Sequence, residues 1–127
     1  MRVLIDTNIL FSALLFPASV PSQALRRAIT EHNVVLCDKN VAELREILQR
    51  KAPKFLPNAE ALLAGFSYEL IHAVDYSAKL IRDVKDQPIL NAAIVFDVDI
   101  ILTGDKDFLS LDIERPKCMN PAEFLEL

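Results

Sequence analysis

Short apolar runs and amphipathic segments alternate along this 127-residue chain. Apolar runs rich in β-branched residues are typical of buried strands, and apolar side chains spaced three or four residues apart are typical of helices. The pattern predicts four strands and a short fifth, over residues 2–6, 33–37, 70–74, 99–103 and 115–119.

Helices are predicted between these strands from the helical spacing of apolar positions. They cover residues 22–32, 41–50, 59–66, 86–96 and 121–127, with short helical pieces near 77–81 and over 106–111. Pro21 is a start signal for the first helix, and Pro88 falls in the first turn of a later one, where a missing N–H costs least. The segment 51–58 holds two prolines and two lysines, Lys51 and Lys54, and is expected to form an exposed elbow.

Strands that alternate with helices favour a mainly parallel sheet with right-handed crossovers. We therefore expect a single domain over residues 1–127, with a three-layer α/β/α architecture around a central sheet of four to five strands. The chain contains no internal repeat, low-complexity tract or domain linker.

The composition is that of a soluble globular protein, with 52% hydrophobic and 25% charged residues. The longest apolar runs are too short for a membrane span, and the N-terminus has no signal-peptide organisation, so we expect a cytoplasmic protein. Cys37 and Cys118 form no metal-type pair and are expected to be reduced core thiols, which argues against zinc. His32 and His72 have no companion at ligand spacing and are interpreted as a helix-end residue and a strand residue.

The net charge of −4 at first argues against a nucleic-acid partner, because phosphate binding requires positive potential. Four carboxylates that held two divalent cations would gain a charge of +4, which would bring the formal total from −4 to 0. Global charge therefore does not exclude such a partner.

Four acidic residues are expected to converge at the carboxyl edge of the sheet, where open parallel sheets form their ligand sites. Asp6 closes the first predicted strand, and Asp105 follows the fourth after Gly104, a glycine expected to allow a sharp turn and to make room beside the acid. Glu43 is placed in the first turn of the helix after the second strand, and Asp86 begins the helix before the fourth strand.

Clustered carboxylates repel one another unless a counter-cation is present. Mg²⁺ and Mn²⁺ prefer carboxylate and water oxygens, and a pair of such ions about 4 Å apart can activate a water and stabilise the leaving oxygen of a phosphodiester. The sequence offers no Ser/His or Cys/His arrangement that competes, so metal-assisted hydrolysis is the favoured chemistry.

Each acid also has a purely structural interpretation. Asp6 could end a strand in a turn, and Asp86 could be a helix N-cap. Glu43 lies three residues after Asn40, as in a capping box, and Asp105 or Asp107 could cap the helix at 106–111.

These residues together resemble the PIN-domain family, over nearly the whole chain. The resemblance is carried by residues 4–10 (LIDTNIL), Glu43-Leu44, residues 82–86 (RDVKD), residues 103–108 (TGDKDF) and a C-terminal PAEFL segment. It implies a Mg²⁺- or Mn²⁺-dependent endoribonuclease, in many small prokaryotic members the toxin of a toxin–antitoxin pair.

Carried over position by position, the resemblance makes Asp6, Glu43, Asp86 and Asp105 the catalytic and metal-binding acids. It makes Asn8 and Thr103 supporting residues and Asp107 an additional or water-mediated ligand. The chain departs from the common family pattern after Asp86, where Gln87 and Pro88 follow, and Asp83 lies one turn earlier. Either Asp83 or Asp86 could therefore contact the metal, and we favour Asp86.

The resulting hypothesis is that Asp6, Asp86 and Asp105 hold one cation while Glu43 orients a second cation or the attacking water. RNA hydrolysis would leave a 3′-hydroxyl and a 5′-phosphate. Lysines that could bind the RNA backbone, or could simply be solvated, are Lys85, Lys106, Lys51 and Lys54.

Two other functions and one interface stay open at this stage. One is a non-catalytic PIN-like module that binds RNA or protein; the other is a receiver-like phosphoacceptor, for which Asp75 would have to end the third strand. The apolar residues Leu14, Leu15 and Phe16 could serve a homodimer or antitoxin interface, or could belong to the core.

Overall fold

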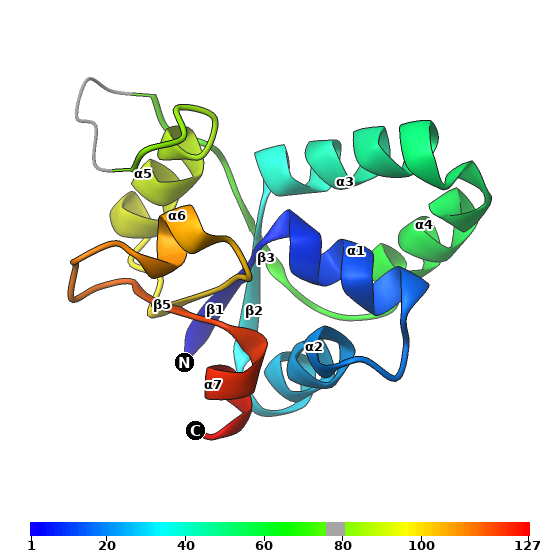
Figure 1. Ribbon diagram of the computed structural model, residues 1–127, viewed down its shortest axis with the longest axis horizontal. Helices are drawn as coiled ribbons and strands as arrows, with labels where there is room; N and C mark the ends of the chain where they lie inside the picture. Colours follow the sequence, from blue (N-terminus) through cyan, green and yellow to red (C-terminus); the bar gives the residue numbers. More distant parts are fainter. Residues whose placement is uncertain (76–80) are drawn as a thin grey trace.

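The computed structural model of the chain describes residues 1–75 and 81–127. Five parallel strands form one sheet in the order β3-β2-β1-β4-β5 (Figure 1). The strands are β1 (Arg2–Ile5), β2 (Asn33–Cys37), β3 (Glu69–Ile71), β4 (Ile100–Leu102) and β5 (Lys117–Met119). Helices cover both faces of the sheet, so the predicted three-layer α/β/α fold is confirmed.

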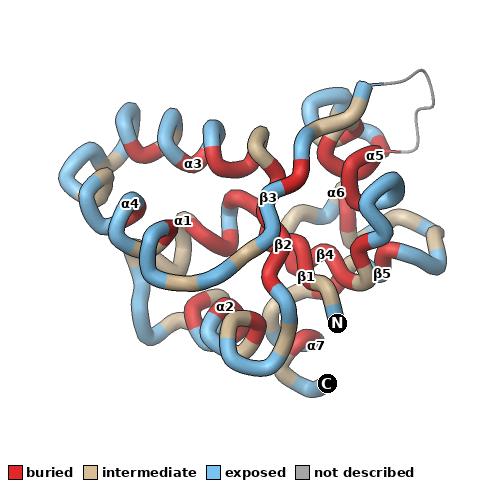
Figure 2. Tube along the Cα trace, turned by 180° about the vertical axis from the view of Figure 1, so that it is seen from behind, coloured by how far each residue is buried: buried red, intermediate tan, exposed pale blue. Residues whose placement is uncertain are grey.

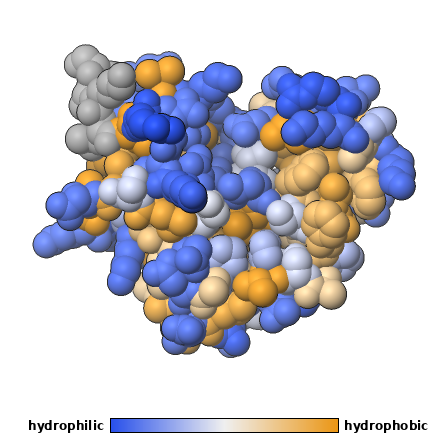
Figure 3. All heavy atoms as spheres, viewed as in Figure 1, coloured by the Kyte–Doolittle hydropathy of each residue, from blue (hydrophilic) through white to orange (hydrophobic). Residues whose placement is uncertain are grey.

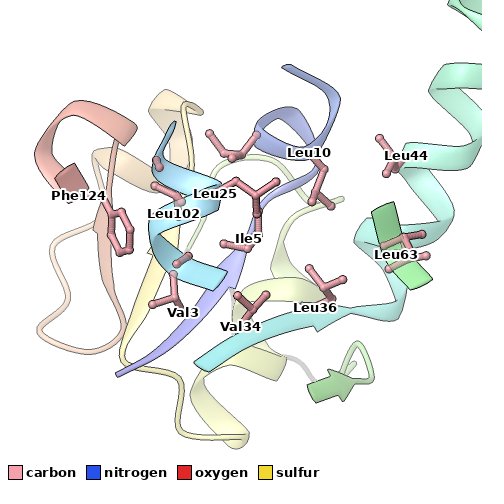
Figure 4. Packing of buried hydrophobic residues seen from close by; sticks show 14 of the residues in the cluster. Val3, Ile5, Leu10, Leu25, Val34, Leu36, Leu44, Leu63, Leu102 and Phe124 are labelled. Atoms are coloured by element: carbon pink, nitrogen blue, oxygen red, sulfur yellow. The ribbon is translucent and has the colours of Figure 1, made fainter. Parts of the chain in front are cut away.

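The strands read as continuous apolar runs because both faces of the sheet are buried. Val3, Leu4 and Ile5 of the central strand are all fully buried, and successive side chains point to opposite faces. Val3 and Ile5 belong to one core, in which they pack with residues of β2 and β4 (Figure 4), whereas Leu4 belongs to the other.

The larger core is covered by helices from both halves of the chain, which bury one side each (Figure 2). These are α1 (Thr7–Leu15), α2 (Val20–Glu31), α3 (Asp38–Lys51), α4 (Leu56–Ala64) and α7 (Pro121–Leu125), with the 3₁₀ turn η1 (Pro53–Phe55) between α3 and α4. The opposite face is covered by α5 (Gln87–Val95) and α6 (Lys106–Leu109). Among the described residues no single helix has the length and apolarity to cross a membrane, although α1 and α2, bent by 111°, meet that test as a pair by length and composition only.

Helix α1 was not predicted, because residues 7–15 are apolar on nearly every side and show no periodicity. Asp6 caps this helix by accepting a hydrogen bond from the Thr7 N–H. Leu14 and Leu15 pack partly buried against the core, as one of the two interpretations held, while Phe16 at the C-cap is 60% exposed.

Other boundaries differ from the prediction for local reasons. β3 ends at Ile71 rather than at residue 74, because the next backbone N–H groups bond outside the sheet, Ala73 to the Asp38 carboxylate and Val74 to the Pro88 carbonyl. The predicted elbow at 51–58 contains η1 and the start of α4. The helical piece predicted at 77–81 falls, apart from Ile81, on residues that lie outside the described part of the chain.

The amino edge of the sheet is closed by ion pairs. Arg2 of β1 pairs with Glu69 of β3 at 2.5 Å, and it also donates to the backbone carbonyls of Phe96 and Asp97. Arg115 pairs with Asp99 at 2.7 Å and with Asp97. Glu69, Asp97 and Asp99 at this edge therefore each have an arginine partner.

We expect Phe124→Ala to lower the free energy of unfolding by about 3–5 kcal/mol, because it removes a fully buried ring that anchors α7 on the core. Urea denaturation followed by circular dichroism measures this. Glu126→Ala, an exposed change on the same segment, is the control and should change the value by less than about 0.5 kcal/mol. Equal stability of the two variants would contradict this packing role.

Candidate active site

Asp6 and Asp105 follow the ends of two neighbouring strands at the carboxyl edge. β1 and β4 pair in parallel with Ile5 opposite Leu102, and the Asp6 N–H donates to the Leu102 carbonyl at 3.0 Å. Each acid then caps the helix that follows its strand, Asp6 at α1 and Asp105 at α6. The structure thus brings these two predicted residues together.

Asp6 is 9% exposed, and three donors hold its carboxylate. The Thr7 N–H and the Asn40 amide donate to Oδ1 at 2.8 and 3.3 Å, and the Thr103 hydroxyl donates to Oδ2 at 2.7 Å. Burial raises the pKa of Asp6; the hydrogen bonds from Thr103 and Thr7 oppose this rise, and the charge of Asp105 adds to it.

Thr103 links the two acids directly. Its hydroxyl donates to Asp6 and accepts from the Asp105 N–H at 3.0 Å. Asn8 is exposed in α1, and its Nδ2 lies 3.8 Å from where a Cβ on Gly104 would stand. Gly104 has no positive φ, and a Cβ there would meet only ordinary van der Waals contact. The structure therefore does not require the conformational freedom or the small size that were expected to matter at this glycine.

Glu43 projects from α3 toward the same edge. Burial raises its pKa, and the charges of Asp6 and Glu46 raise it further. The capping-box interpretation is wrong, because α3 begins at Asp38 and Asn40 already lies inside the helix with its side chain bonded to Asp6. Glu43 was predicted to lie in the first turn of this helix. It lies in the second turn instead, because α3 begins at Asp38.

Asp86 stands among the other acids. Burial, the largest cause, and the charges of Asp6, Asp105, Asp83 and Glu43 together raise its pKa to about 7. It occupies the N-cap position of α5, yet its side chain makes no capping hydrogen bond. The carboxylate is therefore available to a ligand.

Asp105 does serve as a cap, since its Oδ1 accepts from the Asp107 N–H at 2.9 Å. A capping carboxylate keeps a second oxygen, so this role is compatible with metal binding. Carboxylate oxygens of Asp83, Asp86 and Asp107 lie within 4.8 Å of one another. Asp83 and Asp86, the two alternative metal ligands left open by the sequence, therefore lie in the same acidic group. The Arg82 side chain pairs with Asp107 at 3.2 Å.

A pocket of about 580 Å³ opens between α3 and the loop before α5. Figure 3 shows hydrophilic side chains over both of these elements. The charged residues that line this pocket are Glu43, Glu46, Asp83, Asp86, Asp105, Lys39, Arg50 and Lys85. Lys106 lies in a neighbouring pocket with Arg82 and Asp107.

Several residues at this edge were not predicted from the sequence as part of the site, namely Asn40, Lys39, Glu46, Arg50 and Arg82. A signal for three of them exists, because Lys39, Glu46 and Arg50 lie four before, three after and seven after Glu43, on one face of a helix. The predicted elbow lysines Lys51 and Lys54 line neither of these two pockets.

The possible metal ligands at this edge are clustered carboxylates, with no histidine or thiolate among them. Such a set of oxygen donors suits hard divalent cations such as Mg²⁺ and Mn²⁺. The raised pKa of Asp86 has the same implication, because it arises in part from the repulsion of neighbouring carboxylates, which a bound cation would remove. Fold and site together define an α/β protein with an acidic centre at the carboxyl edge of a parallel sheet.

Comparisons with known proteins agree with this class. The PIN domain family model matches residues 2–107. The chain is 32% identical to the uncharacterized protein MJ1680 of Methanocaldococcus jannaschii, over 99% of this chain and 90% of that protein. The chain belongs to the PIN-domain family.

A solved structure has the same fold. A chain in the crystal structure of VapBC2 from Rickettsia felis bound to a DNA fragment from their promoter superposes with a TM-score of 0.70, over 94% of this chain and 98% of that one. The two sequences are 18% identical, so this likeness concerns the fold alone.

In the presence of a chelator, we expect Asp86→Asn to raise the melting temperature at pH 8, with a gain that shrinks toward pH 4. The folded protein keeps a proton on Asp86 up to about pH 7, whereas the unfolded chain releases it near 3.8. The unfolding free energy therefore falls as the pH rises through this interval, and the amide variant escapes this loss.

Thermal melts between pH 4 and 8.5 measure the effect. Glu114→Gln, which removes an exposed acid away from the cluster, is the control for the loss of one carboxylate. A constant difference between Asp86→Asn and wild type at every pH would show that the pKa of Asp86 is not raised in the folded protein.

Proposed function

We propose that this protein is a Mg²⁺- or Mn²⁺-dependent endoribonuclease. The observation that carries the proposal is the convergence of four carboxylates from different segments at one edge of the sheet. Glu43, Asp86 and Asp105 line one pocket, and the charges of Asp6, Asp105 and Glu43 help to raise the pKa of Asp86. Among the described residues none of these four forms an ion pair. Carboxylates in such a place serve binding rather than stability.

Asp6, Asp86 and Asp105 would hold a cation, with Glu43 close by and Asp83 and Asp107 as further ligands. The bound cation supplies Lewis-acid polarisation of a phosphodiester and lowers the pKa of a water. Thr103 orients Asp6 through its hydroxyl and restrains the backbone at Asp105, so two ligands keep their relative position before any cation arrives.

The proposed substrate is RNA, with its backbone along the cationic border of the pocket. Lys39 and Arg50 on α3 and Lys85 in the facing loop lie beside the carboxylates, and Lys106 and Arg82 lie beyond Asp107. Positive groups on both sides of an acidic centre suit a strand that crosses it, because phosphates then meet cations while one phosphodiester meets the metal.

We further propose that the protein is the toxin of a toxin–antitoxin pair and that it forms a homodimer. The support is the shared fold with a chain of the Rickettsia felis VapBC2 complex, together with the family resemblance. Phe16, which is exposed where α1 ends, belongs to the apolar segment that such partners could cover.

The receiver-like alternative does not fit the topology. Receiver-type sheets have the strand order 2-1-3-4-5, whereas this sheet has the order 3-2-1-4-5. Asp75, the acceptor that the alternative requires, lies four residues beyond the end of β3 at Ile71. A non-catalytic PIN module that binds RNA or protein is the remaining alternative, and metal binding with cleavage separates it from the nuclease.

Asp6→Asn should abolish cleavage of a single-stranded RNA in the presence of Mn²⁺. Loss of a residue that only supports a metal ligand lowers metal affinity or activity roughly 10–100-fold, and loss of the ligand itself should cost at least as much. The near-identical shape of asparagine and the reduced repulsion should keep the fold, which circular dichroism and melting measure.

The matched control is Asp97→Asn, the same chemical change at the opposite edge of the sheet, where the residue pairs with Arg115 and asparagine tolerates the φ of 62°. Asp97→Asn should cleave as the wild type does. Wild-type cleavage by a folded Asp6→Asn protein would refute the metal site.

Lys85→Ala should weaken RNA binding and leave Mn²⁺ affinity nearly unchanged, because the residue borders the acids without ligating. Measured by fluorescence anisotropy in an Asp6→Asn background, the slope of log affinity against log salt should fall by about 0.7 for one lost phosphate contact. Lys117→Ala, an exposed lysine on β5, is the control. An unchanged slope would remove Lys85 from the substrate path.

A further inference from the structure

Asn40 is a fully buried amide in the first turn of α3. Its Nδ2 donates to Asp6 Oδ1 at 3.3 Å and to the Thr7 hydroxyl at 3.0 Å. The Thr7 hydroxyl in turn donates to the Asn40 backbone carbonyl at 3.3 Å. These bonds tie the start of α3 to the junction of β1 and α1, where Asp6 lies.

The same amide has a cost for stability. Its Oδ1 is buried and accepts no hydrogen bond from the described residues, and an unsatisfied buried acceptor costs about 1–3 kcal/mol. An apolar side chain of similar shape would avoid that cost. It would also strand no partner, because Asp6 Oδ1 keeps the Thr7 N–H and the Thr7 hydroxyl keeps the backbone carbonyl.

Stability therefore does not account for an amide here, and its contacts point to the site. We propose that Asn40 is a positioning residue that orients the Asp6 carboxylate and fixes it relative to Glu43, one turn further along α3. The inference rests on the proposed function, since its consequence is the affinity for a divalent cation.

The geometry explains how this works. Thr103 holds one oxygen of Asp6 from β4, and Asn40 holds the other from α3, so the plane of the carboxylate is set from two sides. The Thr7 hydroxyl ties the backbone beside Asp6 to α3. The Thr7 N–H that holds Asp6 Oδ1, however, belongs to the same segment as Asp6 and does not relate the carboxylate to α3. Without the Asn40 amide, the link from the side chain of Asp6 to the helix that carries Glu43 is lost.

The test compares wild type with Asn40→Leu by calorimetric titration of the purified, folded proteins with Mn²⁺ alone. We expect Asn40→Leu to bind Mn²⁺ about 10–100-fold more weakly, as other outer-shell losses do, while its melting temperature stays at or above that of the wild type. Asn40→Ala is the second variant if leucine does not fit, because it removes the amide without adding volume.

Leu25→Ala is the control for general destabilisation, since this core residue of α2 contacts no carboxylate in the described structure. It should lower the melting temperature and keep the Mn²⁺ affinity of the wild type. If Asn40→Leu lowers the melting temperature and Leu25→Ala loses as much affinity as Asn40→Leu does, Asn40 acts through stability alone and the proposal is overturned.

Two results separate this inference from the proposed function. If wild type binds Mn²⁺ and Asn40→Leu binds it equally well, Asn40 is not a positioning residue, and the nuclease proposal stands. If wild type itself gives no heat with Mn²⁺, the metal-dependent function fails, and the inference fails with it.

Discussion

Repulsion between carboxylates that the fold forces together is the constraint on which this protein depends. Parallel pairing of β1 and β4 brings Asp6 and Asp105 together, and the second turn of α3 and the start of α5 bring Glu43 and Asp86 to the same edge. The pKa of Asp86, raised to about 7 by burial and by the neighbouring acids, records this conflict. A divalent cation is the simplest group that relieves it.

Asp99 at one edge of the sheet and Asp6 at the other have different kinds of hydrogen-bonding partner. At the amino edge Asp99 accepts from the Arg2 N–H and pairs with Arg115, and these contacts lower its pKa. At the carboxyl edge Asp6 receives only neutral donors, from Thr7, Asn40 and Thr103. Neutral donors orient a carboxylate without cancelling its charge, so the first edge is built for stability and the second for a cationic ligand.

Much of this arrangement could be predicted from the chain itself. Strands buried on both faces appear as apolar runs, so the α/β class and the positions of Asp6 and Asp105 after their strands followed from local pattern and general sheet rules. Helix α1 escaped prediction, because its all-round apolar surface has no periodicity. Glu43 required the family resemblance, because its spacing from Asn40 imitates a capping box.

The sequence by itself therefore determined the fold class and which residues could serve as ligands, since both depend on short-range pattern. Only the tertiary structure decided how the strands are ordered, that Asn40 turns inward to Asp6 instead of capping a helix, and that Asp83 and Asp107 lie with Asp86. These facts depend on contacts between residues tens of positions apart. Hydrogen bonds and charge repulsion act over a few ångströms in space, and spacing along the chain does not reveal them.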